Sequence, residues 1–194
     1  MGRKMSPGVE RQALEAVTRS NIFFDERFAA QNVMGIIRGL SPIDTVHYCE
    51  SAWDIGIDMM EIPIQSPSAI ASLRAAAAAA HLRNRDIGVG TVTTLEQVDE
   101  ARRVGATFTV APGFDTNIAL ASLNAGIAHL PGVATASEIQ RSVAFGFKWL
   151  KVFPALQLSP AWIKAVLAPF PNVCLVATGG IDAYNAEEFL VAGA

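Results

Sequence analysis

Short apolar runs alternate with amphipathic stretches along most of the chain. The runs are rich in Val, Ile and Leu and have the length of single β-strands, whereas apolar residues between them recur at helical spacing. This alternation predicts seven strands with helical segments between them. The expected strands are Val33–Ile37, Ile57–Ile62, Ile87–Val92, Thr107–Ala111, Ile127–Leu130, Trp149–Phe153 and Val173–Ala177.

Residues with capping preferences mark the ends of the helical stretches. Pro follows Ser at 41–42 and again at 159–160, which is typical of a first helical turn. Thr93-x-x-Glu96 and Thr135-x-x-Glu138 have the form of capping boxes. Glycines close the stretches, and their spacing indicates a repeating unit of about 20–25 residues. These glycines are Gly56, Gly105, Gly126, Gly146 and Gly193.

The polar residues that follow the strands favour a barrel over an open sheet. Each expected strand is apolar on both faces, as in a parallel sheet that helices cover. An open doubly wound sheet shares this pattern, but its site gathers at one switch point. Here polar residues follow nearly all the strands, which is how barrel sites are built. We therefore expect an α/β protein of the TIM (β/α)₈-barrel type.

The repeat does not reach an eighth unit. An eighth strand would open at Ala194, so the eighth strand and the last helix are expected to be missing from this chain. We divide the chain into an N-terminal segment, residues 1–32, and barrel units 1–7, residues 33–194. The N-terminal segment should form a helix, Val9–Val17, and an aromatic loop, Ile22–Phe28, that cap the barrel.

Composition and charge argue against several classes of function. The chain has 194 residues, 51% of them hydrophobic, and 15 basic against 18 acidic residues give a net charge of −3. Without a basic face, or an apolar run of about 18 residues, we expect no nucleic-acid partner and no membrane span. The three histidines lack metal-ligand spacing. Cys49 and Cys174 lie in apolar stretches, which suits reduced thiols in the cytoplasm.

A lysine inside an apolar strand is the strongest candidate for chemistry. Alternation places Lys151 on the same strand face as Trp149 and Phe153. Burial beside aromatic rings should lower the pKa of the Lys151 amine and leave more of it neutral, so that it can condense with a ketone. From these residues alone, a structural lysine that pairs with a carboxylate or extends to solvent fits at least as well.

Polar residues at other strand ends could share a site with this lysine. Glu61 lies in an apolar run and needs a partner, which could be Lys151 or Arg38. It could instead transfer protons during Schiff-base formation and carbon–carbon cleavage. Arg38 follows the first strand and could grip a carboxylate. Thr91 offers a hydroxyl after the third strand, and a glycine pair follows the seventh, where barrels commonly hold phosphate.

At these positions the chain resembles the family of 2-keto-3-deoxy-6-phosphogluconate and 4-hydroxy-2-oxoglutarate aldolases, which includes the 2-dehydro-3-deoxy-6-phosphogalactonate aldolases. Seven short motifs carry the resemblance, in the family's order and over almost the whole expected barrel. They are Ile36-Ile-Arg38-Gly39, Glu61-Ile-Pro-Ile64, Gly88-Val-Gly-Thr91-Val92, Val110-Ala-Pro112-Gly113, Leu130-Pro-Gly-Val133, Leu150-Lys151-Val-Phe153-Pro154-Ala155 and Ala177-Thr178-Gly-Gly-Ile181.

The resemblance implies a TIM barrel, a homotrimer and class I aldolase chemistry that needs no cofactor or metal. A 2-keto-3-deoxy sugar acid would be cleaved reversibly to pyruvate and an aldehyde, usually glyceraldehyde 3-phosphate. The resemblance assigns the Schiff base to Lys151 and proton transfer to Glu61. It assigns substrate contacts to Arg38 and Thr91 at the keto-acid end, Pro112 and Phe153 as site walls, and Gly179 and Gly180 at the phosphate.

Two positions leave the identity of the substrate open. Gln65 stands where the phosphogluconate aldolases often have an arginine, and the surrounding pattern Ile62-Pro-x-x-Ser-Pro67 resembles the phosphogalactonate aldolases. Thr178 before the glycine pair instead resembles the phosphogluconate aldolases. Gln65 and Thr178 are therefore placed among the substrate-binding residues without a choice of epimer. The alternatives are a 4-hydroxy-2-oxoglutarate aldolase and, because strand eight is expected to be missing, a barrel of low activity or a pseudoenzyme.

Overall fold

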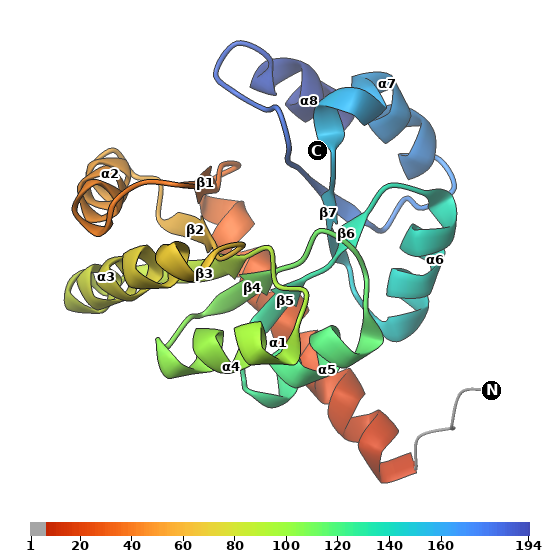
Figure 1. Ribbon diagram of the computed structural model, residues 1–194. Helices are drawn as coiled ribbons and strands as arrows, with labels where there is room; N and C mark the ends of the chain where they lie inside the picture. Colours follow the sequence, from red (N-terminus) through yellow and green to blue (C-terminus); the bar gives the residue numbers. More distant parts are fainter. Residues whose placement is uncertain (1–6) are drawn as a thin grey trace.

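The computed structural model describes residues 7–194, where helices and strands alternate (Figure 1). Residues 1–6 of the expected N-terminal segment lie outside the described residues. The strands are β1 Gly35–Ile36, β2 Met59–Pro63, β3 Asp86–Gly90, β4 Phe108–Val110, β5 Ala128–Leu130, β6 Gly132–Val133, β7 Trp149–Val152 and β8 Cys174–Ala177. The helices are α1 Pro7–Ala30, α2 Pro42–Asp54, α3 Pro67–Arg83, α4 Leu95–Arg103, α5 Thr116–Asn124, α6 Ala136–Phe145, α7 Ala155–Leu167 and α8 Ala186–Ala192. None of these helices is both long and apolar enough to cross a membrane.

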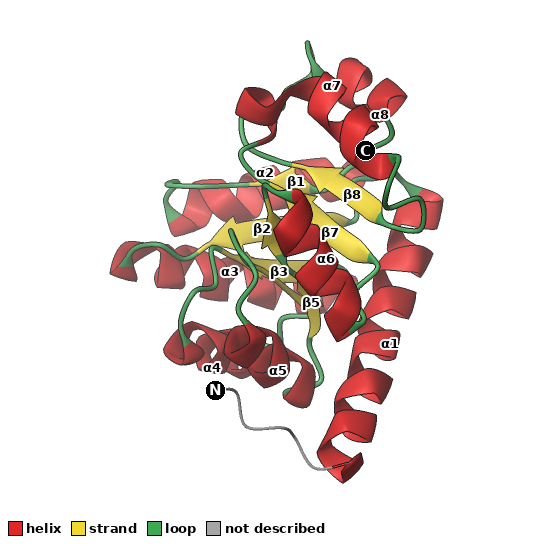
Figure 2. Ribbon diagram, turned by 90° about the vertical axis from the view of Figure 1, so that its right-hand side faces the viewer, coloured by secondary structure: helices red, strands yellow, loops and turns green. Residues whose placement is uncertain are grey.

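Neighbouring strands run parallel and follow chain order. β1 to β5 form one sheet and β6 to β8 form another. The two sheets meet in one extended run, because only Pro131 separates β5 from β6, and its carbonyl accepts a hydrogen bond of 2.8 Å from the amide of Lys151. The helices lie around the outside of the strands (Figure 2). This parallel α/β arrangement of the barrel type confirms the predicted fold class.

The barrel is open on one side within the described residues. β1 pairs only with β2, and β8 pairs only with β7. Since β5 and β6 share one position, the described strands fill seven positions of the barrel. The first strand is also shorter than Val33–Ile37, because only Gly35 and Ile36 pair in register with β2.

Side chains alternate between the barrel interior and the helix layer. On β7, Leu150 and Val152 face outward, in a cluster with Ile139 of α6 and Ile163 of α7. Strand residues of the opposite parity point into the barrel, where they pack with Phe24 of α1. This inner cluster consists of Phe24, Met59, Phe108, Val110, Ala128 and Leu130, with Met34, Trp149 and Val176 packed against it.

The N-terminal helix continues through the segment that was expected to form an aromatic loop. α1 runs to Ala30, so the loop prediction for Ile22–Phe28 is wrong. Phe24 and Phe28 are four residues apart and share one face of the helix. Phe24 is fully buried in the inner cluster, and the Phe28 ring stacks on Trp149 with the centroids 4.7 Å apart. Burial of this aromatic face stabilises the segment as a helix.

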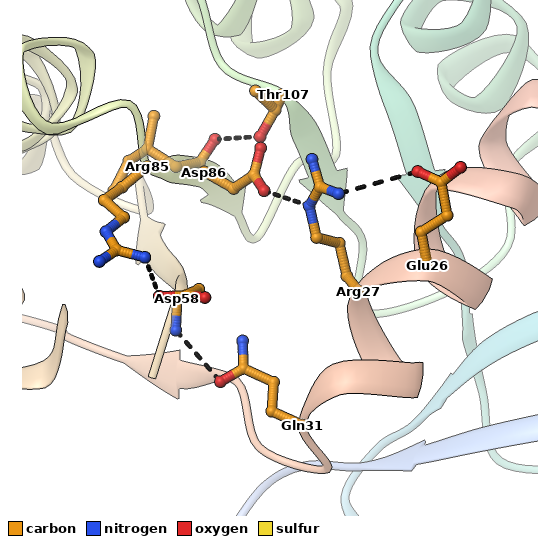
Figure 3. A network of polar contacts seen from close by, with 8 residues as sticks. Glu26, Arg27, Gln31, Asp58, Arg85, Asp86 and Thr107 are labelled. Carbon is orange, nitrogen blue, oxygen red and sulfur yellow. Dashed lines mark hydrogen bonds and ion pairs between the residues drawn. The ribbon is translucent and has the colours of Figure 1, made fainter. Parts of the chain in front are cut away.

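Polar contacts fasten the end of α1 to the beginnings of β2 and β3 (Figure 3). Arg27 donates to the carboxylate of Asp86, and the side-chain oxygen of Gln31 accepts from the amide of Asp58 at 3.1 Å. Arg85 donates to the carboxylate of Asp58. α1 is therefore held at the amino-terminal end of these strands, and the other end of the barrel stays available for a site.

The helix starts follow the capping preferences, with two differences. Ser41 caps α2 and Thr135 caps α6, as predicted. The remaining capping box lies one residue later than expected: Thr94 accepts from the Gln97 amide at 3.3 Å, and Gln97 reaches back to the Thr94 amide. Ser159 lies within α7, where its φ of 77° separates a first turn from the helix that follows. At α4 the reciprocal bonds between Thr94 and Gln97 fix the start, and α7 begins before Ser159, at Ala155.

Candidate active site

β7 carries Lys151 into the interior of the barrel. The alternation is as predicted, because Trp149 packs in the inner cluster while Leu150 and Val152 face the helix layer. The Lys151 side chain is only 6% exposed. Its Nζ atom lies over the ring of Phe153, 5.3 Å from the centroid. The amine is thus enclosed by apolar and aromatic groups near the carboxyl end of its strand.

Glu61 reaches the same amine from β2. Its side chain is fully buried, and its Oε1 atom lies 4.0 Å from Lys151 Nζ. Neither carboxylate oxygen has a hydrogen-bond partner among the residues that the structure describes. Of the partners considered for Glu61, Lys151 is therefore the one that the fold brings into ion-pair range. The free oxygens leave the carboxylate able to accept from a bound molecule.

Glycines on β3 make room for the side chains beside them. A Cβ atom at Gly90 would lie 1.9 Å from Glu61 Oε1 and 2.8 Å from its Cγ. A Cβ atom at Gly88 would lie 2.0 Å from the ring of Phe108. Sequence reasoning missed this role of Gly90. The alternating glycines of Gly88-Val-Gly90 were the available signal, because glycine inside a strand often marks a close approach.

Burial moves the pKa values of the two groups toward each other. Burial raises the pKa of Glu61 above its ordinary value of 4.5, although the positive charges of Lys151 and Arg38 lower it. Burial lowers the pKa of Lys151 below 10.5. The positive charge of Arg38 lowers this pKa as well, whereas the negative charge of Glu61 raises it. Desolvation disfavours both charges and favours a free amine beside a carboxylic acid. Such a pair can attack a carbonyl carbon and exchange protons with it.

Arg38 and Thr91 follow β1 and β3 at the same end of the barrel. Arg38 is exposed and forms no ion pair with another described residue, so the salt bridge to Glu61 that the sequence allowed is not formed. Its charge nevertheless acts on the pKa of Glu61 and of Lys151. Thr91 has a φ of 60°, a backbone region that costs energy for a residue with a side chain and is common at functional sites.

Pro112 and Gln65 lie further along the loops that follow β4 and β2. Pro112 is half-buried. Its close approach depends on Gly132, where a Cβ atom would lie 2.3 Å from the Pro112 carbonyl. Gln65 is exposed, two residues beyond the end of β2. Pro112 is therefore packed against a neighbouring strand end, whereas Gln65 lies at the outer edge.

The residues after β8 are fastened to the beginning of α7. The hydroxyl of Thr178 is buried and donates to the carbonyl of Val152 at 3.4 Å, so this hydroxyl already has a partner at the end of β7. Gly179 and Gly180 both have positive φ, 92° and 79°. Consecutive backbone amides in left-handed turns can form a concave site for an anion, which suits the predicted phosphate position.

A cavity of about 670 Å³ lies on the open side of the barrel, between β1 and β8. Apolar side chains make up most of its wall, including Met34, Trp149 and Leu175. Thr178 and Gly179 reach it, whereas neither Lys151 nor Glu61 lines it. The cavity thus borders the predicted phosphate end and is separate from the buried lysine–glutamate pair.

The part of the chain that holds these residues is similar to known proteins. Residues 24–194 match the family described as KDPG and KHG aldolase, where KDPG stands for 2-keto-3-deoxy-6-phosphogluconate and KHG for 4-hydroxy-2-oxoglutarate. The sequence is 32% identical over 162 residues to the 2-dehydro-3-deoxy-6-phosphogalactonate aldolase of Escherichia coli (strain K12). The matched residues make up 83% of this chain and 78% of that relative. The sequence is 37% identical over 139 residues to the 2-dehydro-3-deoxy-phosphogluconate aldolase of Treponema pallidum (strain Nichols), which covers 70% of this chain. The match spans 64% of that relative, less than two thirds of its length.

Solved structures agree with the sequence comparison. A native KDPGal structure has a TM-score of 0.75 at 32% identity and covers 82% of this chain and 78% of its own. The KDPG aldolase from Legionella pneumophila, with pyruvate captured at low pH as a covalent carbinolamine intermediate, has a TM-score of 0.77 at 32% identity. That match covers 84% of this chain and 79% of the Legionella chain. The resemblance inferred from the motifs is confirmed, and the chain belongs to the KDPG and KHG aldolase family, whose named members are aldolases and therefore lyases.

Proposed function

We propose that this protein is a class I aldolase that cleaves a 2-keto-3-deoxy-6-phospho sugar acid to pyruvate and glyceraldehyde 3-phosphate. The observation that carries the proposal is the buried pair of Lys151 and Glu61, with Nζ and Oε1 4.0 Å apart. An enclosed lysine whose pKa lies below its ordinary value supplies the neutral amine that condenses with a ketone. Glu61 supplies a group beside it that can take and return protons.

The reaction begins at the keto carbon of the substrate. The Lys151 amine attacks carbon 2, and proton transfer from nitrogen to the keto oxygen gives a carbinolamine. Protonation of its hydroxyl by Glu61 and loss of water leave a cationic imine. The pyruvate carbinolamine captured in the Legionella enzyme supports this first stage by relationship.

The cationic imine then accepts the electron pair of the breaking bond. The carboxylate of Glu61 takes the proton of the C4 hydroxyl as the bond between C3 and C4 breaks, and the pair passes into the imine to form an enamine. C4 leaves as the carbonyl carbon of the aldehyde. Return of the proton from Glu61 to C3 and hydrolysis of the imine release pyruvate and restore the free amine.

The ends of the substrate would be held by residues around this pair. The exposed guanidinium of Arg38 is available for the carboxylate, with the hydroxyl of Thr91 beside the keto-acid end. Pro112 and Phe153 would form walls, and the backbone of Gly179 and Gly180 would bind the phosphate. Gln65 and Thr178 stay in the substrate-binding set as proposals.

A second candidate is a 4-hydroxy-2-oxoglutarate aldolase, whose substrate carries no phosphate. The matching family model covers KHG as well as KDPG aldolases, so this activity is tested beside the main proposal. Cleavage assays on the phosphogluconate and phosphogalactonate epimers and on 4-hydroxy-2-oxoglutarate, run side by side, discriminate among these possibilities. Pyruvate release from a phosphorylated epimer alone supports the main proposal.

The Schiff base is tested by trapping it. Incubation with pyruvate and sodium borohydride should add one reduced pyruvate to Lys151, as measured by mass spectrometry of its peptide. Lys151→Met should remove the adduct. Lys148→Met is the matched control, since Lys148 lies on the same segment but pairs with Asp25 outside the site, and it should keep the adduct. A folded parent protein without the adduct would contradict the proposed function.

We further propose a cytoplasmic location. Both cysteines carry free thiols, as suits a reducing compartment. Cys49 is fully buried, and Cys174 on β8 is half-buried.

A further inference from the structure

Phe153 covers the amine of Lys151 at the carboxyl end of β7. Lys151 Nζ lies over the ring, 5.3 Å from its centroid, which is within the range of a cation–π contact. Phe153 directly follows β7, two positions after Lys151, and its ring lies on the side of the Lys151 side chain. A ring in this position stabilises a positive charge on the nitrogen, whether the nitrogen belongs to an ammonium or to an iminium.

Gly179 lies against this ring. A Cβ atom at Gly179 would be 2.9 Å from Cδ2 of Phe153, 3.0 Å from its Cε2 and 3.3 Å from Cα of Pro154. Contacts near 3 Å or below are shorter than carbon atoms tolerate, so the ring would have to move. Only a residue without a side chain leaves the ring where it is.

The backbone at Gly179 is also prevented from moving away from the ring. The amide of Ala155 donates to the carbonyl of Thr178 at 2.8 Å, and the amide of Leu156 donates to the carbonyl of Gly179 at 3.1 Å. These bonds join the end of β8 to the beginning of α7, the helix that directly follows the Phe153 loop. A side chain at Gly179 would therefore press on the ring, in addition to the strain that a φ of 92° imposes on any residue with a Cβ atom.

We propose that Gly179 is a positioning residue for the lysine: its missing side chain keeps the Phe153 ring over Lys151 Nζ, where the ring stabilises the cationic nitrogen. This role is independent of the phosphate contact expected for the same glycine. The part that concerns the iminium rests on the proposed function, whereas the contact between ring and amine exists without substrate.

The protonation midpoint of Lys151 tests the proposal without substrate. Competitive acetylation with acetic anhydride across a pH series, followed by mass spectrometry of the Lys151 peptide, reports this midpoint. Phe153→Leu keeps an apolar side chain but removes the ring, so the midpoint should fall by about 0.7 pH units, a roughly five-fold loss of the charged form. Gly179→Ala should lower it by a similar amount. In a Phe153→Leu background, Gly179→Ala should add no further change.

Gly126→Ala controls for backbone strain. Gly126 also has a positive φ, 77°, but a Cβ atom there would meet nothing within 4 Å. This variant should lose stability and keep the midpoint of the parent, because strain alone does not reach the lysine. If its midpoint fell as far as that of Gly179→Ala, the effect would come from strain and the proposal would be overturned.

Three further results would overturn the proposal. The first is an unchanged Lys151 midpoint in Gly179→Ala, and the second is a full effect of Gly179→Ala in the Phe153→Leu background. The third is an unchanged midpoint in Phe153→Leu, which decides the matter even if Gly179→Ala does not fold. Borohydride trapping of the parent with pyruvate separates this proposal from the proposed function. A missing adduct contradicts only the function, whereas an unchanged midpoint with a normal adduct contradicts only the role of Gly179.

Discussion

The position of the Glu61 carboxylate depends on the neighbouring residue of β3. Register pairs Pro63 with Gly90, and the Glu61 side chain occupies the space that a side chain at Gly90 would fill. Gly88 gives the same space to Phe108 lower in the barrel. Two glycines of one strand therefore serve different purposes, one for the inner cluster and one for the site.

Gly90→Ala should displace the Glu61 carboxylate from Lys151. Overpacking of this kind costs about 1–3 kcal/mol of stability. Gly88→Ala is the matched control, because it lies on the same strand face and would press on Phe108 instead. Urea unfolding should show a loss in both variants. Borohydride trapping of pyruvate should slow about 100-fold only in Gly90→Ala, because proton transfer there is impaired. Equal trapping rates in the two variants would contradict this role of Gly90.

Glu61 also makes the stability of the protein depend on pH. Burial raises its pKa in the folded chain above 4.5, so the folded state holds more protons than the unfolded state between these two values. The free energy of unfolding must then decrease as pH rises through that window. Lys151 acts in the opposite direction, because its pKa is lowered, and the stability that it contributes increases as pH rises toward 10.5.

Glu61→Gln should remove the part of the free energy of unfolding that decreases as pH rises. Above pH 4.5 and up to the raised pKa, urea unfolding should show a stability that falls less with pH in the variant than in the parent, by about 1 kcal/mol for each pH unit. Glu187→Gln, at an exposed position of α8, should keep the parent's pH dependence. Parallel curves for the parent and Glu61→Gln would show that Glu61 does not hold its extra proton in the folded chain.

At the scale of elements, α1 has the most consequence for the barrel. Its aromatic face fills the amino-terminal end of the interior, where Phe24 packs edge-on against Phe108 with the ring centroids 6.1 Å apart. Arg27 and Gln31 then bond to β3 and β2. The helix thus completes the inner cluster directly beneath the level of Lys151 and Glu61, so its loss would remove support from the site.

Phe24→Ala should destabilise the protein by about 3–5 kcal/mol, the usual cost of emptying a buried aromatic site. Ile22→Ala on the same helix is the comparison, since Ile22 is 49% exposed, and its effect should stay within about 0.5 kcal/mol. Urea unfolding followed by circular dichroism measures both. If the two variants were equally stable, α1 would not contribute the packing described above.

At the scale of the whole molecule, large apolar side chains are exposed on several helices. Ile43, near the beginning of α2, is 82% exposed, and Leu82, near the end of α3, is 86% exposed. Large apolar side chains in water are typical of surfaces that meet another chain.

We expect the protein to be a homotrimer, as its family resemblance implies. Sedimentation equilibrium at micromolar concentrations should give the mass of three chains. Leu82→Glu should leave the fold intact and test whether the exposed end of α3 takes part, since a buried charge in an interface weakens association. A parent that sediments as a single chain across this concentration range would contradict the prediction.

Much of this protein is determined by local pattern. The strand–helix repeat, the caps at Ser41 and Thr135 and the strand face that Lys151 shares with Trp149 all follow from apolar periodicity and backbone preference among sequence neighbours. The seven motifs taken together, in order and at their spacing, were also sufficient to identify the family. Sequence periodicity alone favoured a structural lysine at least as much as a catalytic one, because burial on a strand is common to both.

Only the tertiary structure decided which groups meet. The 4.0 Å separation of Lys151 from Glu61, the space at Gly90 and the contact of Gly179 with Phe153 each join segments that are distant in the sequence. The aromatic segment Ile22–Phe28 became a helix because the barrel interior could bury it, and β1 and β8 kept free edges because no described strand lies between them. The physical reason is common to these cases: local preference sets the element, whereas burial and steric fit between distant elements select its neighbours.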